Sequence, residues 1–223
     1  MVSAALVGAA VTYARCVRPR LLGWGASPEE SAATLPGDEL MSSADVQATR
    51  AITVRSPVAA VRPWIAQMGQ GRGGLDSYDA LENLFGCEMH SAERLVDEWQ
   101  DVAVGDPFRL HPAVALRVAR VDPGRSLVLR GAVPLSETAA PPYDFSWAFV
   151  LDAAVDGSTR LVVRERYRYT RRWGPLLVEP IQLVSFVMSA KMLRGIRDRA
   201  EGRPAARARL AFGPTRLSDP GRH

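Results

Sequence analysis

The stretch DFSWAFVLDAAVDGSTRLVVRERYRYT, residues 144–170, decides the fold, because it holds two runs of alternating residues joined by a turn. Alternation with a period of two is typical of half-buried β-strands, and it predicts strands over 144–153 and 159–170. Between them, residues 156–158 (DGS) have the composition of a tight turn. Strands joined by so short a turn pair in antiparallel fashion, so this stretch predicts a β-hairpin.

The two faces of the second strand differ in chemistry. On one face, four of the five residues from 160 to 168 are arginine, which predicts that this face meets water. The other face should then point into the protein, and it carries Leu161, Val163, Glu165, Tyr167 and Tyr169. The same alternation points Phe145, Trp147, Phe149 and Leu151 inward from the preceding strand.

The remaining elements extend this hairpin into a sheet. Further strands are expected at 49–55, 94–99, 107–111, 115–121 and 126–131, joined mostly by turns. Two short helices, over 58–68 and 78–85, should follow the first strand. A long helix over 175–201 carries a broad apolar stripe, and Pro180 inside it predicts a kink or a break. The order predicts an α+β fold in which an antiparallel sheet of six or seven strands wraps around the C-terminal helix.

The chain divides into three regions by composition. Residues 1–47 are expected to be an apolar segment and a linker, 48–201 the folded domain, and 202–223 a basic flexible tail. The apolar run Val2–Ala14 is shorter than the roughly 20 residues of a membrane-spanning helix. Three interpretations of this segment remain: it is a helix docked on the domain, an interfacial membrane anchor, or the stub of a longer spanning helix.

Bulk composition narrows the functional classes. The 223 residues are 47% hydrophobic and 23% charged, as in ordinary globular proteins. The net charge of +4 comes from arginines that are scattered among acidic residues, so we expect no nucleic-acid partner. Two cysteines without a CxxC pair favour a reducing, cytoplasmic location, with membrane association depending on residues 2–14. Arginines 15, 18 and 20 would keep a membrane-bound domain on the cytoplasmic side.

Several short segments of the sequence resemble those of the START-like, or SRPBCC, superfamily over residues 48–200. They are Ser56-Pro57 before a helix, the turn 122–125 (DPGR), and the hairpin phrases 147–151 (WAFVL) and 157–161 (GSTRL). These are similar to the polyketide cyclase/dehydrase and lipid-transport branch, and the block 67–100 is similar to a bacterial subgroup of the SRPBCC superfamily. The resemblance implies a helix-grip fold, with a ligand cavity between the concave face of the sheet and the long helix. It does not imply one activity, because the superfamily hosts carriers, receptors and enzymes.

In such a fold, the inward strand residues and the inner side of the long helix would line the cavity. The expected lining residues are Trp64, Met68, Tyr78, Phe145, Trp147, Phe149, Val163, Glu165, Tyr167, Met188 and Met192. The first hypothesis is binding of an apolar small molecule, such as a lipid or a polyketide-like compound. The second is a cyclase/dehydrase-type enzyme in which Glu165, Tyr167 or His90 moves a proton. The third is a membrane-associated lipid-handling protein.

Glu165 is the most unusual residue of the predicted cavity. A carboxylate among aromatic side chains is costly to ionise unless it is paired. It would therefore serve as an acid/base or ligand anchor, or else pair with an arginine or tyrosine at the water-accessible end of the sheet.

No metal or cofactor is expected. Cys87 and His90 have ligand-like spacing, but no third ligand accompanies them. The glycine-rich stretch 69–74 (GQGRGG) lacks the Gly-Lys-Ser/Thr ending of a phosphate-binding loop. His111 stands at a predicted strand end before Pro112, which favours a structural role.

Overall fold

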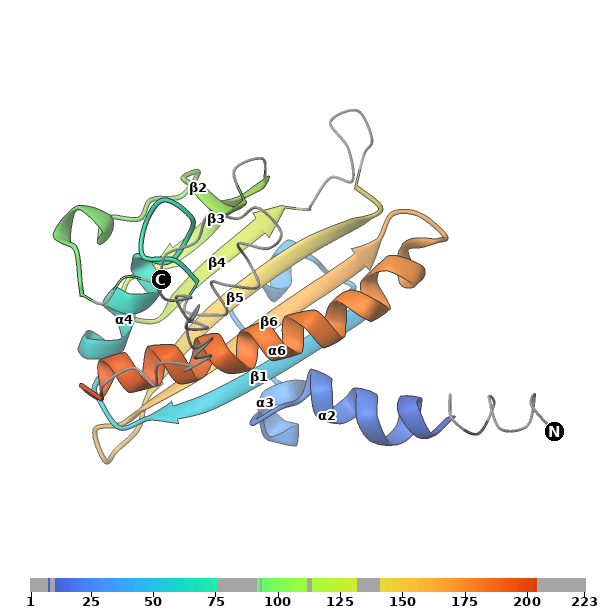
Figure 1. Ribbon diagram of the computed structural model, residues 1–223, viewed down its shortest axis with the longest axis horizontal. Coiled ribbons are helices and arrows are strands. Elements are labelled where there is room, and N and C mark those ends of the chain that lie inside the picture. The colour runs from blue at the N-terminus through green and yellow to red at the C-terminus, as the bar shows by residue number, and fades with distance from the viewer. Residues whose placement is uncertain are drawn as a thin grey trace, which may run out of the picture.

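The computed structural model describes residues 8, 11–75, 92, 94–111, 114–131 and 141–203. Within them, six antiparallel strands form one sheet with a long helix across one face (Figure 1). The strands are β1 (Val46–Val54), β2 (Pro107–His111), β3 (Val114–Asp122), β4 (Ser126–Gly131), β5 (Tyr143–Ala153) and β6 (Thr159–Tyr169). Their spatial order is β1-β6-β5-β4-β3-β2, so the chain crosses once to the far edge and returns by neighbouring strands. The expected α+β helix-grip architecture is confirmed.

The hairpin that decides the fold pairs as its alternation predicts. Strands β5 and β6 are antiparallel, with Phe145 opposite Tyr167 and Trp147 opposite Glu165. Residues directly opposite each other point to the same side of a sheet. The inward face of both strands therefore carries the aromatic residues and Glu165, and this face joins the main hydrophobic core.

Helix α6 (Gly174–Ala200) closes the inner face of the sheet. It buries Val178, Met192, Leu193 and Ile196 against the strands. The sequence predicts a kink or a break at Pro180. The helix continues through Pro180, so the expected break is wrong. Proline removes a single helical hydrogen bond, and packing along the rest of the helix offsets that loss.

The first expected short helix is α4 (Val58–Ala66), which lies on the same side of the sheet as α6 and buries Val61, Trp64 and Ile65. The second, over 78–85, lies outside the described residues, as does the tail after residue 203.

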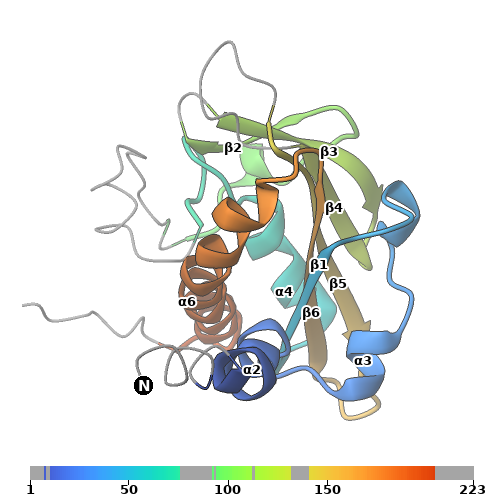
Figure 2. The same cartoon turned by 90° about the vertical axis from the view of Figure 1, so that its right-hand side faces the viewer.

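The N-terminal region contacts the sheet before β1 begins. Helix α2 (Arg18–Leu22) contacts α6 and β1. Helix α3 (Pro28–Ala32) begins at a capping box formed by Ser27 and Glu30. Figure 2 shows α3 on the face of the sheet opposite to α6. The region expected to be a linker thus covers the outer face, where Ala26 and Leu35 pack on a small apolar cluster.

This covering overturns one expectation. The arginines of the outer face of β6 were predicted to meet water, yet Arg164 is 1% exposed. Its guanidinium makes five hydrogen bonds to the strand beside it and to the N-terminal region. The acceptors are the Thr49 hydroxyl, a carboxylate oxygen of Asp38, and the backbone carbonyls of Glu30, Ser31 and Ala33. Alternation fixes which side a residue points to, but not what covers that side.

The strand expected at 94–99 is wrong. That segment is a loop ending in a 3₁₀ helix, Asp97–Trp99. The amide side chain of Gln67 holds it instead of a sheet neighbour: Nε2 donates to the carbonyl of Arg94, and Oε1 accepts from the amide of Val96. A side-chain amide can satisfy backbone groups that would otherwise need a partner strand.

Candidate ligand-binding cavity

A cavity of about 200 Å³ lies between α6 and the inner face of the sheet. Its lining residues are Leu75, Leu110, Phe145, Trp147, Glu165, Tyr167, Ser185, Met188, Ser189 and Met192. The wall is mostly apolar and aromatic, with one polar group of residues where β6 faces α6. A concave apolar site with a few convergent polar groups is the usual form of a small-molecule site.

Glu165 is the centre of the polar group. Its Oε1 accepts from Arg50 Nη1 at 2.8 Å and from the Ser189 hydroxyl at 2.9 Å. Its Oε2 accepts from the Ser185 hydroxyl at 2.5 Å and from the Tyr167 hydroxyl at 3.2 Å. Four donors from three elements therefore fix both carboxylate oxygens.

Arg50 comes from β1, the strand beside β6. Its side chain is 1% exposed, and it forms a buried ion pair with Glu165. Nε donates to the carbonyl of Leu21, which connects α2 to the polar group. Its Nη2 is buried without a hydrogen-bond partner in the described part of the chain. The ion pair offsets the cost of burying each charge, but the arginine is not fully satisfied.

Tyr167 acts here as a hydrogen-bond donor. Burial, and secondly the negative charge of Glu165, raise the pKa of the Tyr167 hydroxyl well above its usual value. The hydroxyl therefore keeps its proton at neutral pH. Aromatic contacts also fix the ring, whose centroid lies 4.7 Å from that of Phe145 and 5.5 Å from that of Tyr143.

Helix α6 supplies the opposite wall from one of its faces. Ser185, Met188, Ser189 and Met192 recur at intervals of three and four, so they lie along one side of the helix. The buried Gln182 precedes them on the same side. Polar residues occupy the part of this face that meets Glu165, and methionines occupy the part that meets the apolar wall.

The structure divides the residues assigned to the cavity from sequence. Phe145, Trp147, Glu165, Tyr167, Met188 and Met192 line it together. Trp64, Met68, Phe149 and Val163 are buried in the core but do not line it. Alternation gives the inward direction, whereas position along the strand decides whether a residue meets the cavity or another side chain. Tyr78, His90 and Cys87 lie outside the described residues.

Sequence reasoning missed Arg50, Ser185 and Ser189. Arg50 shares strand parity with the apolar residues Ile52 and Val54, so the sequence already indicates that it points inward. The serines interrupt the apolar stripe of the long helix at helical spacing, which is the pattern of a polar group on a buried face.

Glu165 is paired with both an arginine and a tyrosine, but deep in the sheet and not at a water-accessible end.

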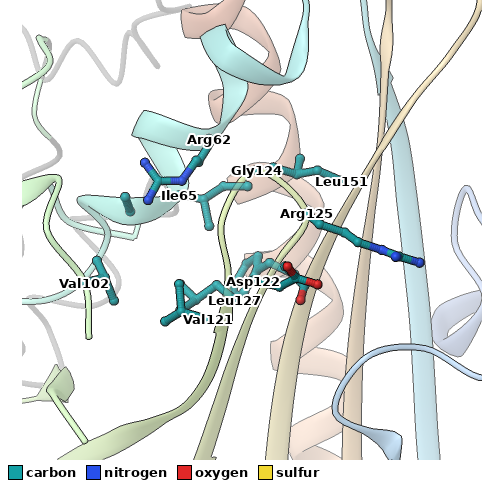
Figure 3. A pocket seen from close by; sticks show the side chains of 12 residues that line it. Arg62, Ile65, Val102, Val121, Asp122, Gly124, Arg125, Leu127 and Leu151 are labelled. Atoms are coloured by element: carbon teal, nitrogen blue, oxygen red, sulfur yellow. The ribbon is translucent and has the colours of Figure 1, made fainter. Parts of the chain in front are cut away.

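A second hollow lies at the other end of the inner face, beside α4. Figure 3 shows it between Arg62 and Ile65 of α4 and the β3–β4 turn, with the guanidinium groups of Arg62 and Arg125 pointing to opposite sides. Its volume is about 30 Å³, and its wall is mainly aliphatic and aromatic. That is room for one or two waters, not for an organic ligand.

The six-stranded antiparallel sheet, the long C-terminal helix and the cavity between them define a helix-grip domain, the fold of the START-like superfamily. No family model matches the chain, and no curated protein matches it either.

Solved structures similar to the chain include the Helicobacter pylori protein jhp0584, at 11% identity over 76% of this chain and 96% of that chain, with a TM-score of 0.46. Ara h 8.0201 is 16% identical over 71% of this chain and 99% of that chain, with a TM-score of 0.42. DynU16, from the dynemicin biosynthetic locus, is 15% identical over 72% of this chain and 49% of that chain, with a TM-score of 0.41. Identities this low concern the fold alone.

Proposed function

We propose that this protein binds an apolar small molecule, of a lipid or polyketide-like kind, in the cavity between α6 and the sheet. The observation that carries the proposal is a cavity of about 200 Å³ whose apolar wall is interrupted at one place by a fixed polar group. For scale, an apolar cavity of about 150 Å³ is large enough to hold benzene. A ligand that fills this site would be stabilised by burial of its apolar surface.

The polar residues suggest what else the ligand carries. The hydroxyls of Ser185 and Ser189 lie at the cavity wall, where each donates to Glu165 and accepts from Arg50 Nη1. Each hydroxyl oxygen has a second lone pair that can accept a hydrogen bond from a ligand. The indole Nε1 of Trp147 is buried and has no acceptor in the described part of the chain. A ligand with a hydroxyl or carbonyl group would complement these residues, because unsatisfied buried polar groups cost free energy.

Binding fits the geometry better than proton transfer does. An acid/base residue needs a lone pair or proton within reach of the substrate. Both oxygens of Glu165 already accept from protein donors, and burial keeps the proton on Tyr167. The cyclase/dehydrase alternative would require a substrate that displaces one of these donors.

The test is native mass spectrometry of the protein purified from its own host. We expect a bound small molecule that denaturation releases. Met188→Trp should fill the cavity and abolish the additional mass, because Met188 lines it. Val187→Trp is the matched control, since Val187 is the neighbouring residue on the exposed side of the same helix and is 39% exposed.

Two results would contradict the proposal. One is wild-type protein that carries no ligand and also leaves the fluorescence of an added apolar dye unchanged. The other is a ligand that Met188→Trp and Val187→Trp retain equally.

A further inference from the structure

Large exposed apolar side chains are concentrated on two adjoining helical segments. Eight of the eleven among the described residues belong to α6, its N-cap, or residues 11–17. They are Val11, Tyr13, Val17, Trp173, Leu176, Leu183, Val184 and Val187. Isolated exposed apolar residues are ordinary, whereas a contiguous group marks an interaction surface.

On α6 these residues form a stripe opposite the cavity. Leu176, Leu183, Val184 and Val187 follow helical spacing, and Leu176 is 80% exposed. By length and composition, α6 is the one helix of the described residues that could cross a membrane, a test that core helices also pass. Here only 33% of its most apolar window is buried, so the sheet covers one side of α6, and the other apolar side has no partner among the residues that the structure describes.

Residues 11–22 lie beside the N-terminal half of this helix. Arg18 of α2 forms two hydrogen bonds to Glu179 of α6, at 3.0 and 2.8 Å. Trp24 contacts Phe186 edge to face, with ring centroids 6.3 Å apart. Figures 1 and 2 both place α2 next to α6. We call the exposed residues of these two segments the α6 outer surface.

Basic residues outnumber acidic residues in the two segments that form the α6 outer surface. Residues 1–28 contain three arginines and no acidic residue. Residues 171–200 contain six basic residues and two acidic residues, Glu179 and Asp198, which are paired with Arg18 and Arg197. The apolar stripe is bordered by Arg171 and Arg172 at one end and by Lys191 and Arg194 at the other.

We propose that the α6 outer surface docks on a lipid bilayer that contains anionic headgroups. An apolar helical face with basic residues around it is the pattern of helices that lie in a membrane interface, where apolar burial and attraction to anionic lipids act together. A second copy of the chain fits less well, because a symmetric interface would bring the two sets of basic residues together. The proposal does not depend on a ligand in the cavity, although the opposite face of the same helix lines it.

The test is co-flotation of the full-length protein with vesicles. We expect binding to vesicles of phosphatidylcholine with phosphatidylglycerol, and little binding to vesicles of phosphatidylcholine alone. Added salt should weaken binding, because it screens the headgroup charge. Leu183→Asp with Val187→Asp should lower the partition coefficient by about tenfold or more, because two carboxylates would enter the interface.

The matched control is Val104→Asp with Val155→Asp, which makes the same kind of change at apolar residues that are 65% and 110% exposed elsewhere on the protein. This variant should bind vesicles as the wild type does, and the melting temperatures of both variants should report intact folds. The proposal is overturned if the wild type ignores anionic vesicles. It is overturned equally if both double variants bind alike, or if the wild type is a dimer that only Leu183→Asp with Val187→Asp dissociates.

Discussion

The two faces of the sheet each bury an arginine beside a carboxylate, and the two groups differ in what surrounds them. On the outer face, Arg164 uses its five N–H donors in five hydrogen bonds, three of them to backbone carbonyls. On the inner face, Arg50 bonds to Glu165 and two serine hydroxyls, while Nη2 has no partner among the described residues. Both arginines are 1% exposed.

Burial of a charge therefore does not by itself identify a functional site. Arg164 holds the N-terminal region on the sheet, and it is not among the residues that line the 200 Å³ cavity. The Arg50–Glu165 pair adjoins a 200 Å³ cavity, which Glu165 lines together with the hydroxyl-bearing Ser185 and Ser189. The difference predicts a structural role for the first pair, and both a structural and a binding role for the second.

The largest effect should come from Arg164→Met. Removing this cation takes a charged donor from Asp38 and from three backbone carbonyls, although Leu35 and Arg166 still contact the Asp38 carboxylate. The free energy of unfolding should fall by about 3 kcal/mol, the lower end of the range for broken buried ion pairs. Urea denaturation measures the change. Arg168→Met is the control, because its ion pair with Asp144 is partly exposed and should contribute about 0.5 kcal/mol. Equal losses in the two variants would contradict the structural role of Arg164.

Glu165→Gln should have the next largest effect. It keeps the shape of the side chain but leaves the buried charge of Arg50 uncompensated, so unfolding should become easier by about 2–3 kcal/mol. Adding Arg50→Met should recover part of this loss, and a double-mutant cycle measures the recovery. Strictly additive losses would show that the two charges do not interact.

Ligand binding separates the two faces more sharply. Ser185→Ala removes a hydroxyl from the cavity wall, so ligand affinity should fall by about tenfold, while stability falls by about 1 kcal/mol. The control is Ser126→Ala, because the buried Ser126 hydroxyl has no hydrogen-bond partner in the described residues and lies outside this cavity. Titration with the ligand identified by mass spectrometry checks both variants. If Ser185→Ala binds it as tightly as the wild type, the polar group does not contact the ligand.

The smallest expected effect is the loss of the Glu30 carboxylate, whose contribution to stability depends on pH. A hydrogen bond from Arg160 is the main cause that lowers the pKa of the Glu30 carboxyl. A carboxyl with a lowered folded-state pKa stabilises the protein above its unfolded-state pKa, and this stabilisation is lost as the pH falls through the folded-state value. Glu30→Gln should therefore lose about 1 kcal/mol or less at neutral pH, and its deficit should shrink below about pH 4. Unfolding curves of the wild type and the variant at several pH values measure this difference. If the stability difference grew as the pH fell, the predicted role of the Glu30 carboxylate would be wrong.

The order of the elements was readable from local chemistry. Alternation, turn residues and the apolar stripe of residues 175–201 act over short distances along the chain, so they predict the hairpins and the long helix. The segment 94–99 was misread because Gln67, distant in sequence, satisfies its backbone. The same parity that placed Glu165 inward could also have placed Arg50 beside it.

The sequence by itself determined which way each strand residue points, because backbone geometry alternates whatever the surroundings are. Only the tertiary structure decided what each face meets: the N-terminal region over Arg164, and Arg50 with two serines around Glu165. It also decided that some inward residues line a cavity while others fill the core, as Trp147 and Val163 do respectively. The physical reason is that direction is a property of the local backbone, whereas burial and pairing depend on residues far apart in the chain.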